Sequence, residues 1–192
     1  MPHWPHQVML QGVVMFRSAC YWPLLMLLFY PVTSHADHPV QAAQANLPTA
    51  PPVLQQANMS LALANQLIAA TLQACHAQHK SAVVSVVDRG GNLVAVQRDD
   101  TVGPHNTEAA QRKAFTALST QTPTRLLAER VRNSPDAQYL ANLDSLLLIG
   151  GGVPVFSDTE IIGAIGVGGA GGAVADEQCA LQAIQQVLPT SN

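Results

Sequence analysis

The sequence predicts an α+β protein in which helices cover an antiparallel sheet of about five strands. Two pairs of short apolar runs are each joined by a polar turn of hairpin length, and such tight connections imply antiparallel pairs. Segments with helical spacing lie before, between and after these pairs, an order that favours helices packed on one antiparallel sheet. The paired runs are Ala82–Val87 with Leu93–Gln97 and Val153–Phe156 with Ile161–Val167.

Length and composition fit one folded domain. The chain has 192 residues, 48% of them hydrophobic, which is enough to bury a core. The formal net charge is −3 and no cluster of Lys and Arg stands out. We therefore expect no nucleic-acid partner.

Residues 1–36 have the layout of a secretory signal peptide. Arg17 precedes an apolar block, Tyr21–Val32, and Ser34-His35-Ala36 places small residues where a signal peptidase cleaves. The layout is most natural if translation starts at Met15. The block is shorter than the roughly 20 residues that a membrane-spanning helix needs. We expect a periplasmic or secreted protein with no membrane span in its mature form.

Residues 37–58 form a linker rich in Pro, Ala and Gln, and the folded domain is expected over residues 59–192. Ser60 is a suitable N-cap for a first helix that ends near His79-Lys80. The apolar residues of this helix recur at helical spacing: Leu61, Ala64, Ile68, Leu72 and Cys75.

Glycine and proline residues mark where the later helices start and end. Gly103-Pro104 starts a second helix with its body over Glu108–Ser119, and Thr122-Pro123 ends it. A short basic helix then runs through Arg132. A last helix carries an apolar stripe of Val174, Leu181, Ile184 and Leu188.

The run Ile161–Val167 has two unlike faces, because successive strand residues point to opposite sides. Ile161, Ile165 and Val167 share one face, with Gly163 between them. The other face holds Ile162, Ala164, Gly166 and Gly168 and is nearly bare after Ile162. A bare face is best explained by something that comes close. A helix, a second subunit and a flat ligand are the alternatives.

A dinucleotide-binding motif is excluded here, although Gly166, Gly168 and Gly171 spell G-x-G-x-x-G. The chain ends after one further helix, so no second parallel strand can follow. Asp176 and Glu177 occupy the first turn of that helix, where they would repel a pyrophosphate.

Cysteine and histidine offer two further hypotheses. Cys75 and Cys179 are the only cysteines beyond the signal peptide, and a disulfide between them is left open. Cys75-His76-x-x-His79 suggests a metal site, but a buried thiol with two surface imidazoles explains the same pattern.

His105 is the most suggestive candidate for chemistry. It stands at a helix start, and the dipole there favours the neutral imidazole, the form that binds metals. An exposed first-turn histidine is the plain alternative. Positive charges follow on the middle helices and could meet ligand carboxylates, although solvated ion pairs are commoner. They are Arg112, Lys113, Arg125, Arg130 and Arg132.

Three blocks of sequence resemble the GlcG/HbpS-like haem-binding family. Val86–Ala95 resembles its opening strand pair, Pro104–Ala117 its central helix, and Gly151–Val155 with Glu160–Val167 its glycine-rich hairpin. The resemblance extends over Met59–Leu188. It implies a profilin-like sheet flanked by helices, assembly into dimers or rings, and haem binding or slow haem degradation in some members.

The same resemblance implies a set of site residues and an accessory or sensing role in some relatives. The positions that match the central motif are His105, Thr107, Arg112, Lys113 and Thr116. His105 as the axial metal ligand is our own hypothesis. The run Gly168–Gly172 departs from the family pattern, since it is looser than the usual turn.

The leading hypothesis is thus an exported, homo-oligomeric haem- or tetrapyrrole-binding protein. Its ligand would rest on Ala109, Ala110 and the bare face of Ala164 and Gly166. Arg112, Lys113 or Arg125 would meet the propionates. One rival is an enzyme acting on a small carboxylate, with His105 as general base and Arg112 binding the substrate. Another is an oligomeric accessory protein without ligand.

Overall fold

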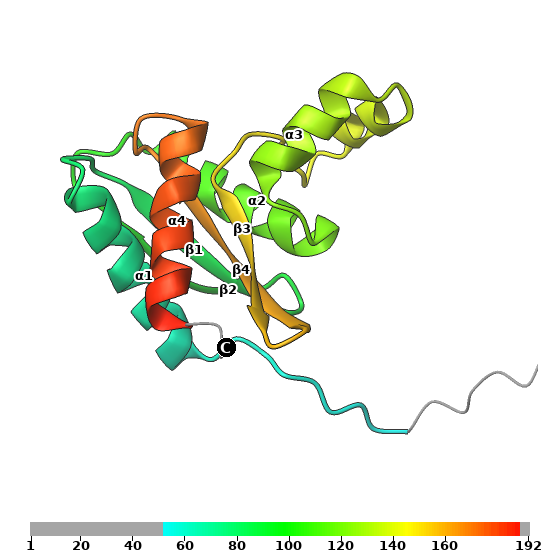
Figure 1. Ribbon diagram of the computed structural model, residues 1–192, viewed down its shortest axis with the longest axis horizontal. Coiled ribbons are helices and arrows are strands. Elements are labelled where there is room, and N and C mark those ends of the chain that lie inside the picture. The colour runs from blue at the N-terminus through cyan, green and yellow to red at the C-terminus, as the bar shows by residue number, and fades with distance from the viewer. Residues whose placement is uncertain (1–51, 189–192) are drawn as a thin grey trace, which may run out of the picture. The chain divides into compact units, whose positions relative to one another are not determined.

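The computed structural model describes residues 52–188, so the expected signal peptide and most of the expected linker lie outside the described residues. Four longer helices, one 3₁₀ helix and four strands follow one another in this part of the chain (Figure 1). Their order is α1 Leu61–His76, β1 Val83–Asp88, β2 Leu93–Arg98, α2 His105–Thr120, α3 Thr124–Asn133, η1 Asp136–Asn142, β3 Gly152–Ser157, β4 Glu160–Gly168 and α4 Ala173–Val187.

The strands form one antiparallel sheet in the order β2-β1-β4-β3. The two hairpins expected from the sequence lie side by side, with β1 and β4 paired at the centre. Ser85 of β1 stands opposite Gly166 of β4, and Gly166 stands opposite Gly152 of β3. The α+β class and the helix-flanked antiparallel sheet are confirmed, with four strands in the described residues where about five were expected.

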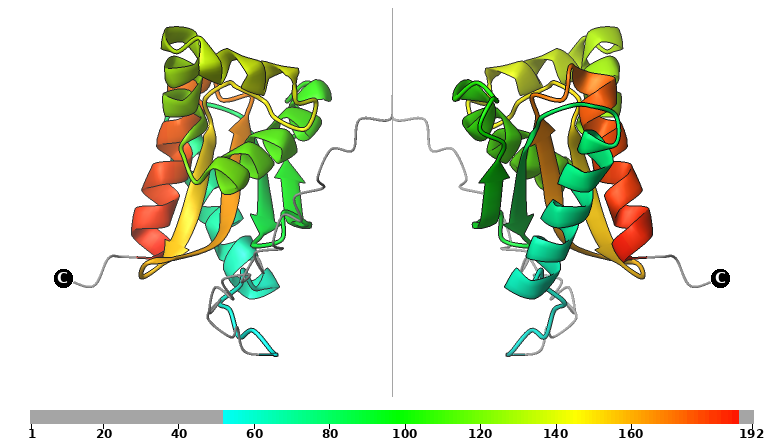
Figure 2. Two further views of the ribbon diagram at one scale, coloured as in Figure 1. Left: turned by 90° about the vertical axis from the view of Figure 1, so that its right-hand side faces the viewer. Right: turned by 90° about the vertical axis from the view of Figure 1, so that its left-hand side faces the viewer.

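Helices cover both faces of this sheet. Figure 2 shows α1 and α4 side by side on one face and α2 on the opposite face. Helix α3 and η1 follow α2 and lie beyond the end of the sheet at which β3 begins (Figures 1 and 2). None of the helices within residues 52–188 is long and apolar enough to cross a bilayer.

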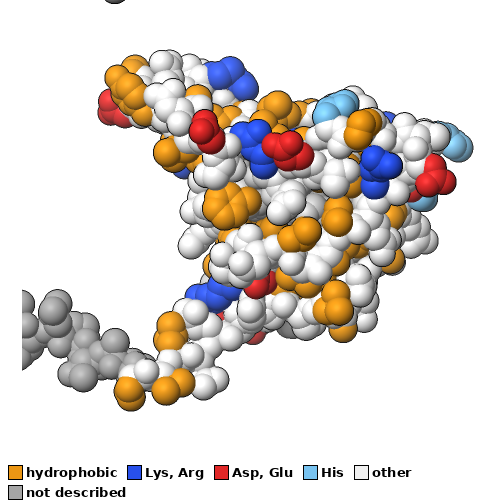
Figure 3. All heavy atoms as spheres, turned by 180° about the vertical axis from the view of Figure 1, so that it is seen from behind, with side chains coloured by type: hydrophobic (Ala, Val, Ile, Leu, Met, Phe, Trp, Pro, Cys, Tyr) orange, Lys and Arg blue, Asp and Glu red, His pale blue; other side chains and the backbone are white. Residues whose placement is uncertain are grey.

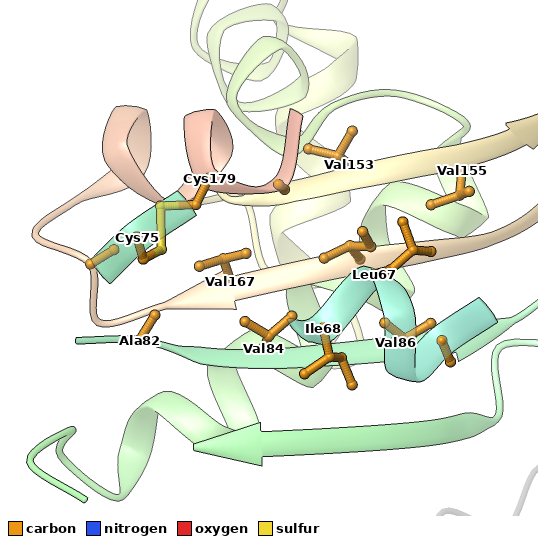
Figure 4. Packing of buried hydrophobic residues seen from close by; sticks show 14 of the residues in the cluster. Leu67, Ile68, Cys75, Ala82, Val84, Val86, Val153, Val155, Val167 and Cys179 are labelled. Atoms are coloured by element: carbon orange, nitrogen blue, oxygen red, sulfur yellow. A yellow bond between two sulfur atoms is a disulfide. The ribbon is translucent and has the colours of Figure 1, made fainter. Parts of the chain in front are cut away.

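The larger core lies between the sheet and the helix pair α1 and α4. Leu67 and Ile68 of α1 are fully buried against Val84 of β1 and Val167 of β4 (Figure 4). Ser60 caps α1 as expected, because its hydroxyl accepts a hydrogen bond of 3.1 Å from the Leu63 amide.

Cys75 and Cys179 join α1 to α4 through a disulfide at the edge of this core (Figure 4). Their Cα atoms lie 5.4 Å apart, and both side chains are fully buried. The disulfide that the sequence left open is therefore present, and Cys75 is not available as a metal ligand. The residues within 52–188 contain no group of three or more His, Cys, Asp or Glu side chains suited to a metal ion.

The nearly bare face of β4 is covered by α2. A Cβ atom added at Gly166 would overlap the Ala110 carbonyl oxygen and would lie 2.6 Å from the Ala114 nitrogen. Helix α2 therefore packs backbone to backbone on β4. Of the three alternatives, the helix is correct, and the expectation that a haem ring rests on Ala164 and Gly166 is wrong.

A bulge changes which isoleucine faces which layer. The register of β3 and β4 shifts between Val155 and Phe156. As a result, Ile162 joins the core under α1 and α4, whereas Ile161 packs on the α2 side. Strict alternation had placed these two residues the other way round.

Helix α4 is rotated relative to the expected stripe. Val174 is 58% exposed and Leu181 38%, while Asp176 and Glu177 are buried. The reason is that both carboxylates have cationic partners on other helices, Lys113 of α2 and Arg125 of α3.

Candidate functional site

One side of α2 faces away from the sheet and carries two of the five expected site residues, His105 and Arg112. The exposed His105 begins it, and Glu108, Arg112 and Phe115 follow at spacings of three, four and three residues. Such spacings keep side chains on one side of a helix. Because an α-helix rises 1.5 Å per residue, the ten steps from His105 to Phe115 cover about 15 Å. The buried side of α2 consists mainly of Ala110, Ala114 and Ala117.

The start of α2 holds the His105 ring close to the preceding loop. Pro104 is the N-cap and provides no side-chain hydrogen bond. A Cβ atom added at Gly103 would lie 3.0 Å from Cε1 of His105, so the ring rests where glycine leaves room. Val102 is buried and anchors the loop beneath it. His105 is thus both exposed and supported on one side.

Thr107 is half-buried and lies on a different side of the helix from His105, since two residues correspond to more than half a turn. The structure therefore does not bring these two expected site residues together on one surface.

Arg112 and Thr116 hold a loop against α2. One terminal nitrogen of Arg112 donates hydrogen bonds to the carbonyl oxygens of Asp144, at 2.6 Å, and Leu146, at 2.9 Å. The Thr116 hydroxyl accepts a 2.8 Å bond from the Leu147 amide. Both residues thus fix residues 144–147. The Arg112 Nε is buried and has no hydrogen-bond partner in the described part of the chain.

Lys113 lies in a buried ion pair. Its Nζ is 2.8 Å from Asp176 Oδ2 and donates to the Val167 carbonyl oxygen, also at 2.8 Å. The other oxygen of Asp176 accepts a bond from the Ala170 amide. The Lys113 side chain is 6% exposed. Its ammonium therefore ties α2 to β4 and α4 and has little surface for a ligand.

Arg125 makes a comparable contact at the start of α3. Its Nε lies 3.1 Å from the buried carboxylate of Glu177. Asp176 and Glu177 thus face partners from α2 and α3, which explains the orientation of α4.

A cavity of about 290 Å³ opens beside the exposed side of α2. Its lining is Gly91, Glu108, Gln111, Arg112, Phe115 and Ser145. The half-buried Phe115 ring packs on the turn between β1 and β2, where a Cβ atom at Gly91 would lie 2.8 Å from it. Figure 3 views the molecule from behind and shows charged side chains of both signs among hydrophobic patches on that face. An aromatic ring, a guanidinium and a carboxylate, from Phe115, Arg112 and Glu108, therefore line the same cavity.

Phe115 was missed by sequence reasoning, although a signal was present. It is an aromatic residue in an alanine-rich helix, and it shares the polar side with Glu108 and Arg112 rather than the alanine side. An aromatic residue on that side predicts either a neighbouring loop or a ligand.

His76 serves a structural contact at the end of α1. Its Nε2 lies 2.8 Å from Asp99 Oδ2, which also accepts a 2.8 Å bond from the Ala82 amide. Burial raises the pKa of Asp99, but the Ala82 and His76 contacts outweigh it, so the pKa lies below its ordinary value.

Comparisons with known proteins place this geometry in context. A family model described as haem degrading protein HbpS-like matches residues 59–185. Protein GlcG of Escherichia coli K12 is 38% identical over 109 residues, which cover 57% of this chain and 80% of GlcG.

Two solved structures share the fold. The crystal structure of HbpS superposes with a TM-score of 0.66 at 35% identity, covering 71% of this chain and 94% of HbpS. The crystal structure of a PduOC–haem complex gives a TM-score of 0.62 at 25% identity, covering 69% of this chain and 96% of that one.

Proposed function

Because the chain belongs to the HbpS-like haem-degrading protein family, we propose that it is an exported protein that binds haem along the exposed side of α2. The family expected from the sequence is confirmed by these similarities. One observation carries the proposed location: an exposed imidazole, His105, and a cavity lined by Phe115 and Arg112 lie on the same side of one helix.

The residues on this side fit the chemistry of haem. Haem is a flat apolar ring with two carboxylates, and its iron accepts a histidine nitrogen as axial ligand. Phe115 offers a face for stacking, and His105 offers the imidazole. Because the iron lies at the centre of the ring, a ring ligated by His105 extends only half its width toward Phe115, so its propionate edge lies nearest Glu108 and Arg112 of the cavity. When bound, the iron supplies ligand binding and redox chemistry.

The size of the cavity indicates how much of the ligand it takes. At about 290 Å³ it is slightly smaller than typical small-molecule sites, which measure roughly 300–1,000 Å³. We therefore place one edge of the ring in the cavity and the rest along the helix toward His105. We further propose that the protein degrades the haem it binds. Loss of the haem absorbance in the presence of a reductant and oxygen tests this step.

The other residues of the central motif hold neighbouring segments in place around the site. Lys113 holds α2 on β4, and Thr116 holds residues 144–147 beside the cavity. Arg112 shares this loop contact, while its second terminal nitrogen is 3.9 Å from Glu108. That nitrogen is the part of Arg112 that we assign to a propionate.

The rival function, an enzyme with His105 as general base, is less well supported. It needs Arg112 to bind the carboxylate of the substrate. His105 does not line the cavity that holds Arg112, and a helix rise of about 10 Å separates the two residues, more than a small carboxylate spans.

Export and self-association belong to the same proposal. A buried disulfide between Cys75 and Cys179 is typical of proteins from oxidising compartments and supports export. The mature chain is then expected to begin at Asp37, which N-terminal sequencing of the secreted protein tests. Self-association is supported by exposed apolar side chains on α3 and after it, including Leu126 and Tyr139, which are 46% and 73% exposed. Light scattering that gives a monomer mass would contradict it.

Haemin titration followed by absorbance tests the function. The parent protein is expected to give a sharp, shifted band that saturates at a fixed stoichiometry. His105→Ala should lose the spectrum of a histidine-ligated iron and bind haemin more weakly. His76→Ala is the matched control, because His76 pairs with Asp99 away from this surface. An unchanged spectrum in His105→Ala would remove His105 as ligand, and no saturable band in the parent would contradict haem binding.

A further inference from the structure

A second cavity, of about 360 Å³, lies at the end of the sheet where β1 begins and β2 and β4 end. Three loops form it: the turn after α1 with His79, Lys80 and Ser81, the loop before α2 with Thr101, and the loop Gly169–Gly171 before α4. Asn106 of α2 completes it. It shares no lining residue with the cavity beside Phe115.

The side chains of this cavity favour a negatively charged ligand. Lys80 contributes a positive charge and makes no ion pair with another residue of 52–188. Among the described residues that line the cavity, none is acidic. Of the other seven Lys and Arg residues within 52–188, four have a carboxylate partner: Arg89, Arg112, Lys113 and Arg125. An anion is the ligand that would satisfy Lys80 here.

Neutral donors surround the lysine. The Thr101 hydroxyl donates a 3.0 Å hydrogen bond to the Ser81 hydroxyl, which leaves the Ser81 proton for another acceptor. The imidazole of His79 and the amide of Asn106 line the same space. Oxyanions accept several hydrogen bonds at once, so a ring of donors around one ammonium matches them.

The glycine-rich loop leaves its backbone open to the same space. Gly169 and Gly171 have φ values of +88° and +100°, which side-chain-bearing residues rarely adopt. A Cβ atom at Gly171 would meet no atom of the described residues within 4 Å, so the space on that side of Gly171 is open, whereas one at Gly169 would lie 2.8 Å from Val102. The haem site proposed along α2 does not involve Gly168–Gly172.

We infer that this cavity is a binding site for a small oxyanion, a phosphate or a carboxylate, with Lys80 as the charged contact. The volume exceeds that of a bare ion and fits an anion that carries a small organic group. The inference goes beyond haem binding and rests on different residues. Binding is expected to weaken as salt is raised, because both partners are charged.

Amide NMR of the purified protein titrated with inorganic phosphate at constant ionic strength tests the inference, with acetate as a second titrant. Saturable shifts are expected at the amides of Gly169, Gly171 and Ser81. Lys80→Gln should weaken phosphate binding by about tenfold, and Lys80→Arg should retain it. Arg130→Gln is the control, since it removes the same charge from an exposed position on α3. Shifts with acetate as well would assign the site to oxyanions in general, and shifts with phosphate alone to phosphates.

Two results would overturn the inference. One is the absence of saturable shifts around this cavity with both titrants. The other is equal phosphate affinity in the parent and Lys80→Gln. A well-dispersed amide spectrum of each variant shows that it is folded, so that a loss of binding is not a loss of structure.

Discussion

Adding a side chain at Gly166 tests how α2 is seated on the sheet. The first added carbon would overlap the Ala110 carbonyl oxygen and lie 2.6 Å from the Ala114 nitrogen. Both are helix backbone atoms, which cannot turn aside as the end of a long side chain can. Overfilling a packed core costs about 1–3 kcal/mol. We therefore expect Gly166→Ala to lose about 3 kcal/mol of unfolding free energy, and Gly166→Val to lose more.

Gly168→Ala is the matched control for this experiment. It lies on the same strand and faces the same helix, but its added carbon would be 3.2 Å from the nearest atom, the Asn106 carbonyl oxygen. A cost below about 1 kcal/mol is expected. Urea unfolding followed by circular dichroism gives both values. If Gly166→Ala unfolds within about 0.5 kcal/mol of the parent, α2 does not contact β4 in this way.

Three further changes test other contacts. Lys113→Met should lower the free energy of unfolding by about 3–5 kcal/mol, because it leaves Asp176 buried without its cation. Adding Asp176→Leu should recover part of this loss in urea unfolding. A mild effect of Lys113→Met alone would contradict the buried pair. Reducing the disulfide between Cys75 and Cys179, which are 104 residues apart, should cost roughly 4–5 kcal/mol, as unfolding with and without dithiothreitol would show, while an unchanged midpoint would argue that the bond is not formed. Because the folded pKa of Asp99 is lowered, its stabilising effect is complete above the unfolded pKa of about 3.9 and is lost as pH falls through the lower folded value. Asp99→Asn should therefore lose part of its stability at neutral pH and show a shallower decline below about pH 4, and an identical acid profile would contradict this.

The parts of the fold that depend on local chemistry were predictable from the sequence. Ser60 begins α1 because its hydroxyl satisfies a free amide, and both hairpins follow from polar turns between apolar runs. The short basic helix that was expected to run through Arg132 is α3, which ends one residue later at Asn133.

The parts that depend on distant contacts were not predictable. Asp176 and Glu177 look like exposed first-turn carboxylates, yet they are buried because Lys113 and Arg125 reach them from other helices. Because these two carboxylates face inward, α4 leaves the apolar residues Val174 and Leu181 exposed. Likewise, a bulge that exchanges the faces of neighbouring residues leaves no mark in an apolar run such as Ile161–Val167.

The candidate site was likewise predictable only where it depends on local sequence. The exposure of His105 follows from its place at a helix start, which the sequence indicated. Arg112 and Thr116 contact residues 144–147, more than 25 positions away, so their role as loop contacts could not be read from the motif. Whether haem occupies this surface stays a prediction.

The most direct test of the account is amide NMR of the protein with bound haemin, whose ferric iron broadens signals from nearby residues. If haem lies along the exposed side of α2 with its iron at His105, the amides nearest His105 should broaden first and the effect should fall toward Phe115, while those of the outer sides of α1 and α4 should remain sharp. Broadening centred on α1 and α4, with sharp signals along α2, would contradict the proposed site.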